Sequence, residues 1–460
     1  MRLYKNFPVL KMIRIIALSL VIVFSMTACA DNNTRYYANP KEESNDNNDV
    51  DDIDDVDDID DGNSILKWKV VSNAPLNNVK GIYYGNNKWV AFGADARYYW
   101  ENIIAYSPDG ENWTKVTNSP FKDVRGIVFH HDKWVAFGSD TNSNDIIACS
   151  SDGENWTKVS DSPFIKVHHV FNSNNKWFAY GADHNNAIFA YSTDGENWTY
   201  ISESPFSGIY GIVYVNNKWL AFGYENYDNE TSAYSGFFFA YSPDGENWTK
   251  ISSRPPFEGF NAIVITNSKW VVAGYDYNDN QNIFVSYSDG ENWIEISNNP
   301  FLYISRIFYV NDKWIAFGSD NNSNEIIAYS PDGESWTKVS NNPFEGIYDI
   351  IYNDNKWVAY GKDNNSDYII AYSSNGENWK KVSNNLFSNI GNIVCVNNKW
   401  FAFGSDYQFP YYDIITYSSD GENWKKPSNS PCGYVRNIVY NNNKWIIYGA
   451  GIAYAIGEQW

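Results

Sequence analysis

The sequence has few residues of the kinds that carry thiol or metal chemistry. Its 460 residues include only 4 Cys, 3 Met and 5 His. The scattered cysteines make no disulfide framework, and no HExxH-type spacing, P-loop or Ser-His-Asp elbow is present. Basic residues are also scarce, because 34 Lys and Arg stand against 55 Asp and Glu, for a net charge of −21. Such a surface disfavours nucleic acid and anionic lipid headgroups as partners.

The first 64 residues are expected to lie outside the folded part. Residues 1–29 have a basic start and an apolar run, Ile15–Phe24, that is too short to span a bilayer. The tetrapeptide MTAC ending at Cys29 resembles a bacterial lipobox, which implies a cleaved signal peptide and a lipid on Cys29; a plain secretory signal is the alternative. Residues 30–64 contain DVDDIDDVDDIDDG and are predicted to be a disordered, extended spacer. We therefore expect an exported protein, lipid-anchored in the bacterial cell envelope at the outer membrane or cell surface.

Aromatic residues are abundant, and all of the 20 tryptophans except Trp100 fall in two alternating motifs. The first motif reads AYSPDGENWTKV at residues 105–116 and returns every 42 to 50 residues. The second is Lys-Trp followed by an apolar pair. Its tryptophans are Trp89, Trp134, Trp177, Trp219, Trp270, Trp314, Trp357, Trp400 and Trp445. Repeats of this size cannot bury their own faces and must stack on their neighbours.

Each repeat contains four predicted strands. Between residues 125 and 159, β-branched and aromatic runs alternate with turns rich in Asn, Asp, Gly and Ser, and no helical periodicity follows residue 64. We therefore predict an all-β fold, a β-propeller of nine four-stranded blades over residues 65–460. A strand at 66–72 is expected to pair with the last blade, 436–455, and to close the ring. A ring of eight with one displaced blade is the rival arrangement.

The turn in the first motif has a defined chemistry. In Ser-x-Asp-Gly, the Asp side chain caps the turn and Gly takes the left-handed conformation that ends it. The structural aspartates of these turns are Asp109, Asp152, Asp194, Asp244, Asp289, Asp332 and Asp420. The segment SPDGENW at 107–113 resembles the Asp-box (BNR) repeat of sialidase-like propellers, although it is one residue shorter. The resemblance implies a folding element between the third and fourth strands, away from the ligand face.

One position in each repeat changes its chemistry while its neighbours stay apolar. It lies nine residues before the Lys-Trp tryptophan, and we expect it to begin the innermost strand on the face with the variable loops. The residues at this position, together with aromatic residues of the loops, form the candidate ligand surface, because aromatic, polar and cationic groups together suit sugars or polypeptides. Its residues are Lys80, Arg125, His168, Tyr210, Asn261, Tyr348 and Arg436, with Tyr98, Tyr99, Trp100, Tyr407 and Phe409 from loops; Ser305 and Gly391 hold the other two positions. A solvated rim without function is the alternative.

These features predict a non-catalytic propeller that binds a carbohydrate or protein ligand, without catalytic residues, metal or cofactor. The sialidase resemblance implies a glycoside hydrolase as an alternative, and that chemistry needs an arginine triad for the substrate carboxylate. Arg125, Arg306 and Arg436 are the candidates. Arg306, however, is one residue out of register and should face the other side of its strand, and the Phe/Tyr-Arg-Ile-Pro motif of sialidases is absent.

Two weaker alternatives remain. His168, His169 and His184 are predicted to share one face of one blade, but their spacing matches no established metal motif. The layout is also similar to that of the propeller lipoprotein of outer-membrane β-barrel assembly. That resemblance implies a periplasmic scaffold that binds polypeptide edges rather than glycans.

Overall fold

The computed structural model describes residues 67–456 except for 99, 183–186, 202–203, 216, 229–232, 254, 258, 267–268, 277–280, 288–291, 384–385, 406–412 and 428–432. The predictions for Cys29 and the 30–64 spacer lie outside these residues. The same is true of Tyr99, Asp289, Tyr407 and Phe409. Within the described residues, no helix has the length and apolar character needed to cross a membrane.

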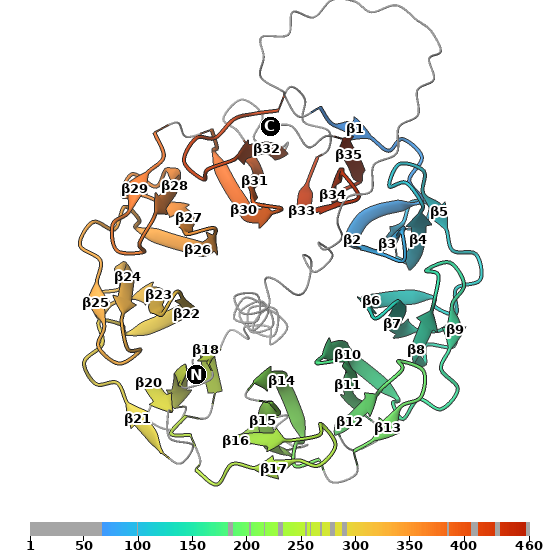
Figure 1. The fold of residues 1–460 in the computed structure, drawn as a ribbon, viewed down its shortest axis with the longest axis horizontal. Helices are drawn as coiled ribbons and strands as arrows, with labels where there is room; N and C mark the ends of the chain where they lie inside the picture. Colours follow the sequence, from blue (N-terminus) through green and yellow to red (C-terminus); the bar gives the residue numbers. More distant parts are fainter. Residues whose placement is uncertain are drawn as a thin grey trace, which may run out of the picture.

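The described residues form nine antiparallel sheets arranged around a ring, with one strand of each sheet at the centre (Figure 1). The innermost strands are β2 (Leu76–Gly85), β6 (Asp123–His130), β10 (Lys166–Ser173), β14 (Gly208–Val215), β18 (Gly259–Ile265), β22 (Tyr303–Val310), β26 (Gly346–Asn353), β30 (Asn389–Val396) and β33 (Val435–Asn441). We number the blades 1 to 9 in this order.

The second strands, which carry the Lys-Trp motif, are β3 (Lys88–Asp95), β7 (Lys133–Ser139), β11 (Lys176–Ala182), β15 (Lys218–Asp228), β19 (Trp270–Asp276), β23 (Lys313–Ser319), β27 (Lys356–Lys362), β31 (Lys399–Ser405) and β34 (Lys444–Gly449). The third strands are β4 (Asn102–Ser107), β8 (Asp145–Ser150), β12 (Ala187–Ser192), β16 (Ala233–Ser242), β20 (Gln281–Tyr287), β24 (Glu325–Ser330), β28 (Tyr368–Ser373), β32 (Asp413–Ser418) and β35 (Ile452–Ile456).

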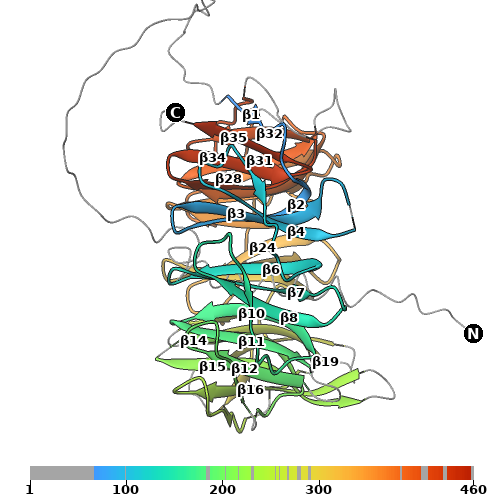
Figure 2. The same ribbon diagram turned by 90° about the vertical axis from the view of Figure 1, so that its right-hand side faces the viewer.

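The outermost strands are short. They are β5 (Thr114–Lys115), β9 (Thr157–Lys158), β13 (Thr199–Tyr200), β17 (Thr249–Lys250), β21 (Trp293–Glu295), β25 (Thr337–Lys338), β29 (Lys380–Lys381) and, in blade 9, β1 (Lys69–Val70). Blade 8 has only the single bridge Tyr417↔Lys425 at this place. Figure 2 shows the ring from its side, with the strands of successive blades crossing its thickness.

The ring closes as predicted from the sequence. β1 pairs antiparallel with β35 in the register Lys69↔Tyr454 and Val70↔Ala453. The Val71 N–H extends this ladder by donating to the Ile452 carbonyl at 3.0 Å. The predicted nine-blade propeller is thus confirmed, and the eight-blade rival is wrong.

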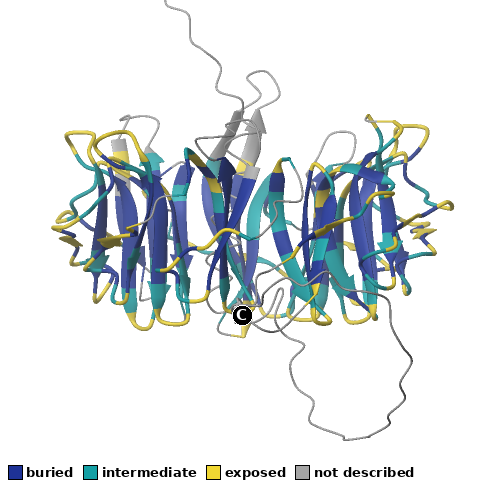
Figure 3. Cartoon of the chain, turned by 90° about the horizontal axis from the view of Figure 1, so that it is seen from above, coloured by how far each residue is buried: buried dark blue, intermediate teal, exposed yellow. Residues whose placement is uncertain are grey.

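The hydrophobic core lies between the blades. Each buried cluster combines two neighbouring sheets; for example, Val90 and Phe92 of blade 1 pack with Ile127 and Trp134 of blade 2. The second strands are therefore buried on both faces, whereas the outermost strands are exposed (Figure 3). This explains why the Lys-Trp strands are continuously apolar and do not alternate.

The two faces of the ring have different turns. The turns between first and second strands and between third and fourth strands lie on one face, which we call the box face. The loops between second and third strands, and the connections that enter each innermost strand, lie on the opposite face, which we call the mouth face. Exposed residues concentrate at both faces and at the outer edge (Figure 3).

Each described box turn is held by its own side chains. In blade 2, Asp152 Oδ1 accepts the Glu154 N–H at 2.9 Å and the Asn155 N–H at 2.8 Å, while Ser150 Oγ accepts the Gly153 N–H at 2.8 Å. Gly153 has φ +74°, and a Cβ on it would lie 2.6 Å from Val90 Cγ2 of blade 1. Glycine is therefore required both by the backbone conformation and by the close approach of the preceding blade.

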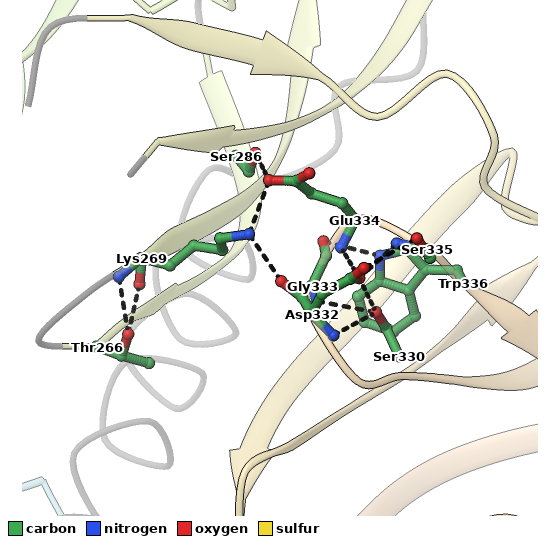
Figure 4. Close-up of polar contacts among 9 residues, drawn as sticks. All are labelled: Thr266, Lys269, Ser286, Ser330, Asp332, Gly333, Glu334, Ser335 and Trp336. Carbon is green, nitrogen blue, oxygen red and sulfur yellow. Dashed lines mark hydrogen bonds and ion pairs between the residues drawn. The ribbon is translucent and has the colours of Figure 1, made fainter. Parts of the chain in front are cut away.

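Ion pairs extend this contact around the ring. In seven blades, among the described residues, the lysine of the Lys-Trp motif contacts the glutamate that follows the Asp-Gly turn of the next blade around the ring. In Figure 4, Lys269 Nζ lies 2.7 Å from Glu334 Oε1 and donates to the Asp332 carbonyl at 2.8 Å. The other described pairs are Lys88–Glu154, Lys133–Glu196, Lys176–Glu246, Lys313–Glu377, Lys356–Glu422 and Lys444–Glu111. Because Lys444–Glu111 joins blade 9 to the Asp-Gly turn of blade 1, this contact also helps to close the ring.

Replacing Asp152 with Ala is expected to lower the free energy of unfolding by about 1–2 kcal/mol, because two backbone N–H groups lose their acceptor. Asp152→Asn should cost less than about 0.5 kcal/mol. The chain contains this change already: in blade 7, Asn375 Oδ1 accepts the N–H groups of Glu377 and Asn378 at 3.0 Å. Urea unfolding followed by tryptophan fluorescence measures both variants.

The pH dependence gives a control for this prediction. Partial burial favours protonated Asp152, but the hydrogen bonds from Asn155 and Glu154 outweigh it and hold the pKa well below its ordinary value. A carboxylate whose pKa is lowered by folding contributes stability above about pH 4 and loses it as the pH falls. Asp152→Asn should remove the part of the unfolding free energy that the wild type loses as the pH falls. If Asp152→Asn and Asp152→Ala lowered the free energy of unfolding equally, the assigned role of Asp152 as the hydrogen-bond acceptor of the turn would be contradicted.

Candidate functional site at the mouth of the ring

A β-bulge interrupts every innermost strand close to the mouth face. In blade 2, Val124 pairs with Gly138 and Gly126 with Phe137, so Arg125 has no partner on β7. The other eight innermost strands shift register at the same place. The skipped residues nine positions before the Lys-Trp tryptophans are Lys80, Arg125, His168, Tyr210, Asn261, Ser305, Tyr348, Gly391 and Arg436, and we call them the bulge residues; β2 also skips Asn78.

The predicted ring of variable residues is therefore a ring of bulge residues. The expectation that they begin the innermost strands is wrong, because pairing continues on both sides of the bulge: β6 begins at Asp123, two residues before Arg125. A bulge leaves its extra residue outside the ladder and redirects its side chain. Such a residue packs less regularly than its neighbours, which explains how its chemistry can differ from blade to blade. Five of the nine are exposed, namely Lys80, Arg125, His168, Tyr348 and Gly391, and the other four are half-buried.

The bulge residues of blades 9, 1, 2 and 3 are mainly cationic. Arg125 forms an ion pair with Asp145, which also accepts the Val167 N–H of blade 3 at 2.9 Å. Lost hydration, followed by the charge of Arg125, lowers the pKa of His168. Arg436 reaches from blade 9 to blade 1, donating from Nη2 to Asn78 Oδ1 at 3.2 Å. This part of the mouth thus carries positive charge in an otherwise acidic protein.

The bulge residues of blades 4 and 7 are tyrosines. The Tyr210 ring lies 5.2 Å from that of Tyr224 and 6.0 Å from that of Phe260, centroid to centroid. Tyr348 is 44% exposed, and its ring lies 5.9 Å from Tyr368. Partial burial, together with the hydroxyl of Tyr368, raises the pKa of Tyr348 to about 12. Tyr348 is therefore neutral at physiological pH, and both tyrosines offer an apolar ring with a polar end.

An aromatic pair stands on the loop between β3 and β4. Tyr98 is 51% exposed and Trp100 is 74% exposed, with ring centroids 5.8 Å apart. The start of the loop is fixed because Asp95 Oδ1 accepts the N–H groups of Arg97 and Tyr98 at 2.7 and 3.2 Å. A fixed backbone that presents exposed aromatic rings is suited to contact a ligand.

Three loops of the mouth face share one structure. The loops that begin at Asp140, Asp320 and Asp363 have the same structure: each carboxylate accepts backbone N–H groups from the residues two and four positions further on. Its other oxygen binds the lysine of the outermost strand, as in Lys158–Asp140 at 3.1 Å. The loops of these three blades therefore stabilise the fold and are not candidates for a variable ligand surface.

Sequence reasoning missed a buried ion pair beside the bulges. Arg306 follows the bulge residue Ser305, and its Nη1 lies 2.8 Å from Asp349 Oδ1 and 2.9 Å from Oδ2. Both side chains are only 12% exposed. Burial raises the pKa of Asp349 to about 6, against the opposing effect of Arg306. Asp349 follows the bulge residue of blade 7, just as Arg306 follows that of blade 6. Opposite charges at the same position of two successive repeats were therefore the sequence signal for this ion pair.

This pair also separates the three candidate arginines. Arg306 binds Asp349, Arg125 binds Asp145, and Arg436 contacts Asn78, so each is held by a different partner. Within the described residues, no group of three or more His, Cys, Asp or Glu side chains is arranged to hold a metal. His184 lies outside those residues, and His168 and His169 are neighbours on β10.

Known proteins share this fold. A family model described as the DUF6242 β-propeller domain matches residues 107–346, which is more than half of the 460 residues. The chain belongs to the DUF6242 β-propeller family. No curated protein matches this DUF6242 chain significantly.

Solved structures that resemble the DUF6242 chain are propellers of peptidases. The β-propeller domain of the trilobed protease from Pyrococcus furiosus is 10% identical, with a TM-score of 0.36 over 68% of this chain and 97% of its own. An acylaminoacyl peptidase complex is 9% identical, with a TM-score of 0.35 over 74% of this chain and 59% of its own. A prolyl endopeptidase is 9% identical, with a TM-score of 0.41 over 71% of this chain and 54% of its own. Likeness at this level carries no argument about activity.

Proposed function

We propose that this DUF6242 propeller is a non-catalytic binding protein whose mouth face holds a carbohydrate. The observation that carries the proposal is the ring of bulge residues. In each of the nine blades a bulge takes the residue at this position out of the ladder, and these residues differ in charge, size and hydrogen bonding. A rigid scaffold that presents differing groups at equivalent points is suited to recognition.

The exposed apolar residues support the same face. Eleven large hydrophobic side chains are exposed among the described residues. Seven of them belong to the loops, connections or bulges of the mouth face: Tyr98, Trp100, Ile165, Leu302, Tyr303, Tyr348 and Tyr434. Aromatic rings beside polar groups suit the faces of sugar rings, which are apolar on their C–H side and polar at their hydroxyls.

The path of the chain suits a tethered binder. We propose that the protein is a lipoprotein held through Cys29 and the 30–64 spacer. β1 occupies the place of an outermost strand, and Lys69 pairs with Tyr454 toward the box-face end of β35. The residues before Lys69 therefore join the ring from the box-face side. An attachment on that side leaves the mouth face unobstructed for a ligand.

The proposal predicts that replacing Arg125, Tyr348 and Arg436 together with Ala abolishes binding. Loss of two cationic groups and one aromatic group should weaken affinity at least about a hundredfold, at 1–3 kcal/mol for each contact. The measurement is retention of residues 65–460 on an array of neutral and sialylated glycans with matrix proteins. Retention and sugar release are both recorded.

A matched control removes the same groups from the outer strands. Lys380, Lys425 and Tyr200 are exposed there and are replaced together with Ala. This variant should bind like the wild type. Release of sugar by the wild type would contradict the non-catalytic assignment and favour the glycosidase. Binding to matrix proteins alone would favour a protein ligand. No retention on any part of the array would contradict the proposal.

A further inference from the structure

A shallow pocket lies at the mouth face between blades 5 and 6. Its volume is about 260 Å³ including its open entrance. Three carboxamides line it, those of the bulge residue Asn261, of Asn282 on β20 and of Asn299 in the connection to blade 6. Its apolar walls include Phe284, Phe301 and Leu302.

The corresponding junction between blades 6 and 7 is bridged. The connections into blades 6 and 7 share the sequence SNNPF, at 297–301 and 340–344. In the second copy, Asn342 Nδ2 donates to the Glu325 carbonyl at 2.8 Å and so ties the connection to β24 of blade 6. In the first copy, Asn299 Nδ2 donates instead to the Ile296 carbonyl at 2.8 Å, within its own connection. Among the described residues, Asn299 makes no hydrogen bond to the third strand of blade 5, and the junction stays open.

The bulge residue adds to the opening. In blade 2, Arg125 reaches Asp145 at the start of the third strand, and in blade 7 the Tyr348 ring approaches Tyr368 at the same place. Asn282 occupies the equivalent place in blade 5, and Asn261 makes no hydrogen bond or ion pair to it among the described residues. The shorter side chain leaves space where blades 2 and 7 have a contact.

The pocket therefore holds two carboxamides whose hydrogen bonds are not used by the described protein groups. Each carboxamide offers two N–H donors and one oxygen acceptor and carries no charge. Among the described residues, no cationic or anionic side chain lines the pocket. Phe284 is 6% exposed and forms part of the floor, whereas Leu302 is 46% exposed at the rim. Neutral donors and acceptors above an apolar floor match a ring that carries neighbouring hydroxyl groups.

We propose that this pocket is a subsite for a single neutral sugar ring. Asn261 and Asn282 hydrogen-bond two of its hydroxyls, and its C–H face lies against Phe284 and Phe301. A carboxylated or phosphorylated sugar is disfavoured here, because none of the described residues that line the pocket is a cation that could pair with the charge once it lost its water. The subsite rests on the proposed carbohydrate function and names the class of sugar that enters the blade 5–6 part of the mouth.

The test uses the methyl glycosides of glucose, galactose, mannose and N-acetylglucosamine as probes. Saturation-transfer NMR with residues 65–460 should show binding of at least one of them. Asn261→Leu and Asn282→Leu should each raise its Kd about tenfold or more, because a hydroxyl then meets an apolar group in place of its hydrogen-bond partner. Thermal unfolding verifies that both variants are folded.

Asn389→Leu is the matched control. Asn389 is an exposed asparagine of β30 on the mouth face, outside the pocket wall, and its replacement should leave the Kd unchanged. Loss of binding in the two pocket variants and not in Asn389→Leu supports the subsite. Unchanged binding in the pocket variants, equal loss in all three, or no binding of any probe by the wild type would overturn it. Since the glycan array tests the whole mouth face, retention there would show that the wider proposal survives failure of the subsite.

Discussion

Replacing Arg306 with Met or Asp349 with Leu is expected to lower the free energy of unfolding by about 3–5 kcal/mol. Each change removes one partner of an ion pair whose side chains are only 12% exposed, and leaves the other charge buried without compensation. The pair also joins β22 of blade 6 to β26 of blade 7. Urea unfolding followed by circular dichroism measures the cost.

The double variant and the pH dependence test this explanation. Arg306→Met combined with Asp349→Leu should recover most of the loss, because no charge stays buried. The pKa of Asp349 is about 6 in the folded protein and 3.8 ordinarily, so its proton is bound more tightly when folded. The resulting stability is complete below about pH 4 and is lost as the pH rises through 6. Arg306→Met should therefore cost less at pH 5 than at pH 7.5, where Asp349 cannot easily take up a proton.

Asp349→Leu is the internal control, because the orphaned Arg306 keeps its charge at both pH values. Its cost relative to the wild type should be larger at pH 5 than at pH 7.5, the opposite of Arg306→Met, because only the wild type loses the stability contributed by the Asp349 proton as the pH rises. A pH-independent cost for Arg306→Met would show that the lost packing of the arginine, rather than the buried carboxylate, sets the result.

The architecture could be predicted because the repeat itself encodes it. Trp68 belongs to the same series as Trp113, so an extra outermost strand before the first blade implied closure with the last. The bulges could not be predicted in the same way. A bulge is a difference in length between two paired strands, and the apolar pattern on either side of Arg125 is compatible with continuous pairing or with one skipped residue.

The finer parts of the site depend on contacts between repeats. Arg306 was expected to face the other side of its strand from the ring, but its partner Asp349 belongs to the next repeat, so their contact requires the order of the blades. Asn299 and Asn342 lie in identical pentapeptides and make different hydrogen bonds. No local pattern separates them, because the difference comes from the neighbouring strands. Sequence reasoning therefore located the mouth without finding the pocket in it.

Replacing Trp68 with Ala is expected to cost about 3–5 kcal/mol and to weaken ring closure. Trp68 is 2% exposed and packs with Trp445, Ile447 and Ala453. β1 itself contributes only two paired residues, so burial of Trp68 supplies much of what holds it to β35. Thermal unfolding measures the loss of stability, and hydrogen exchange of the Val71 N–H, which donates to the Ile452 carbonyl, reports on closure.

Trp113→Ala is the matched variant, because Trp113 precedes the two-residue strand β5 of blade 1 and is 8% exposed. It should lose a similar amount of stability through the same large cavity. β5, however, is joined through the chain to blade 1 before it and blade 2 after it, whereas β1 is joined to the ring only at its C-terminal end. Faster exchange at Val71 is therefore expected in Trp68→Ala and not in Trp113→Ala. Equal exchange in the two variants would mean that the Lys444–Glu111 contact and the core between blades 9 and 1 close the ring without β1.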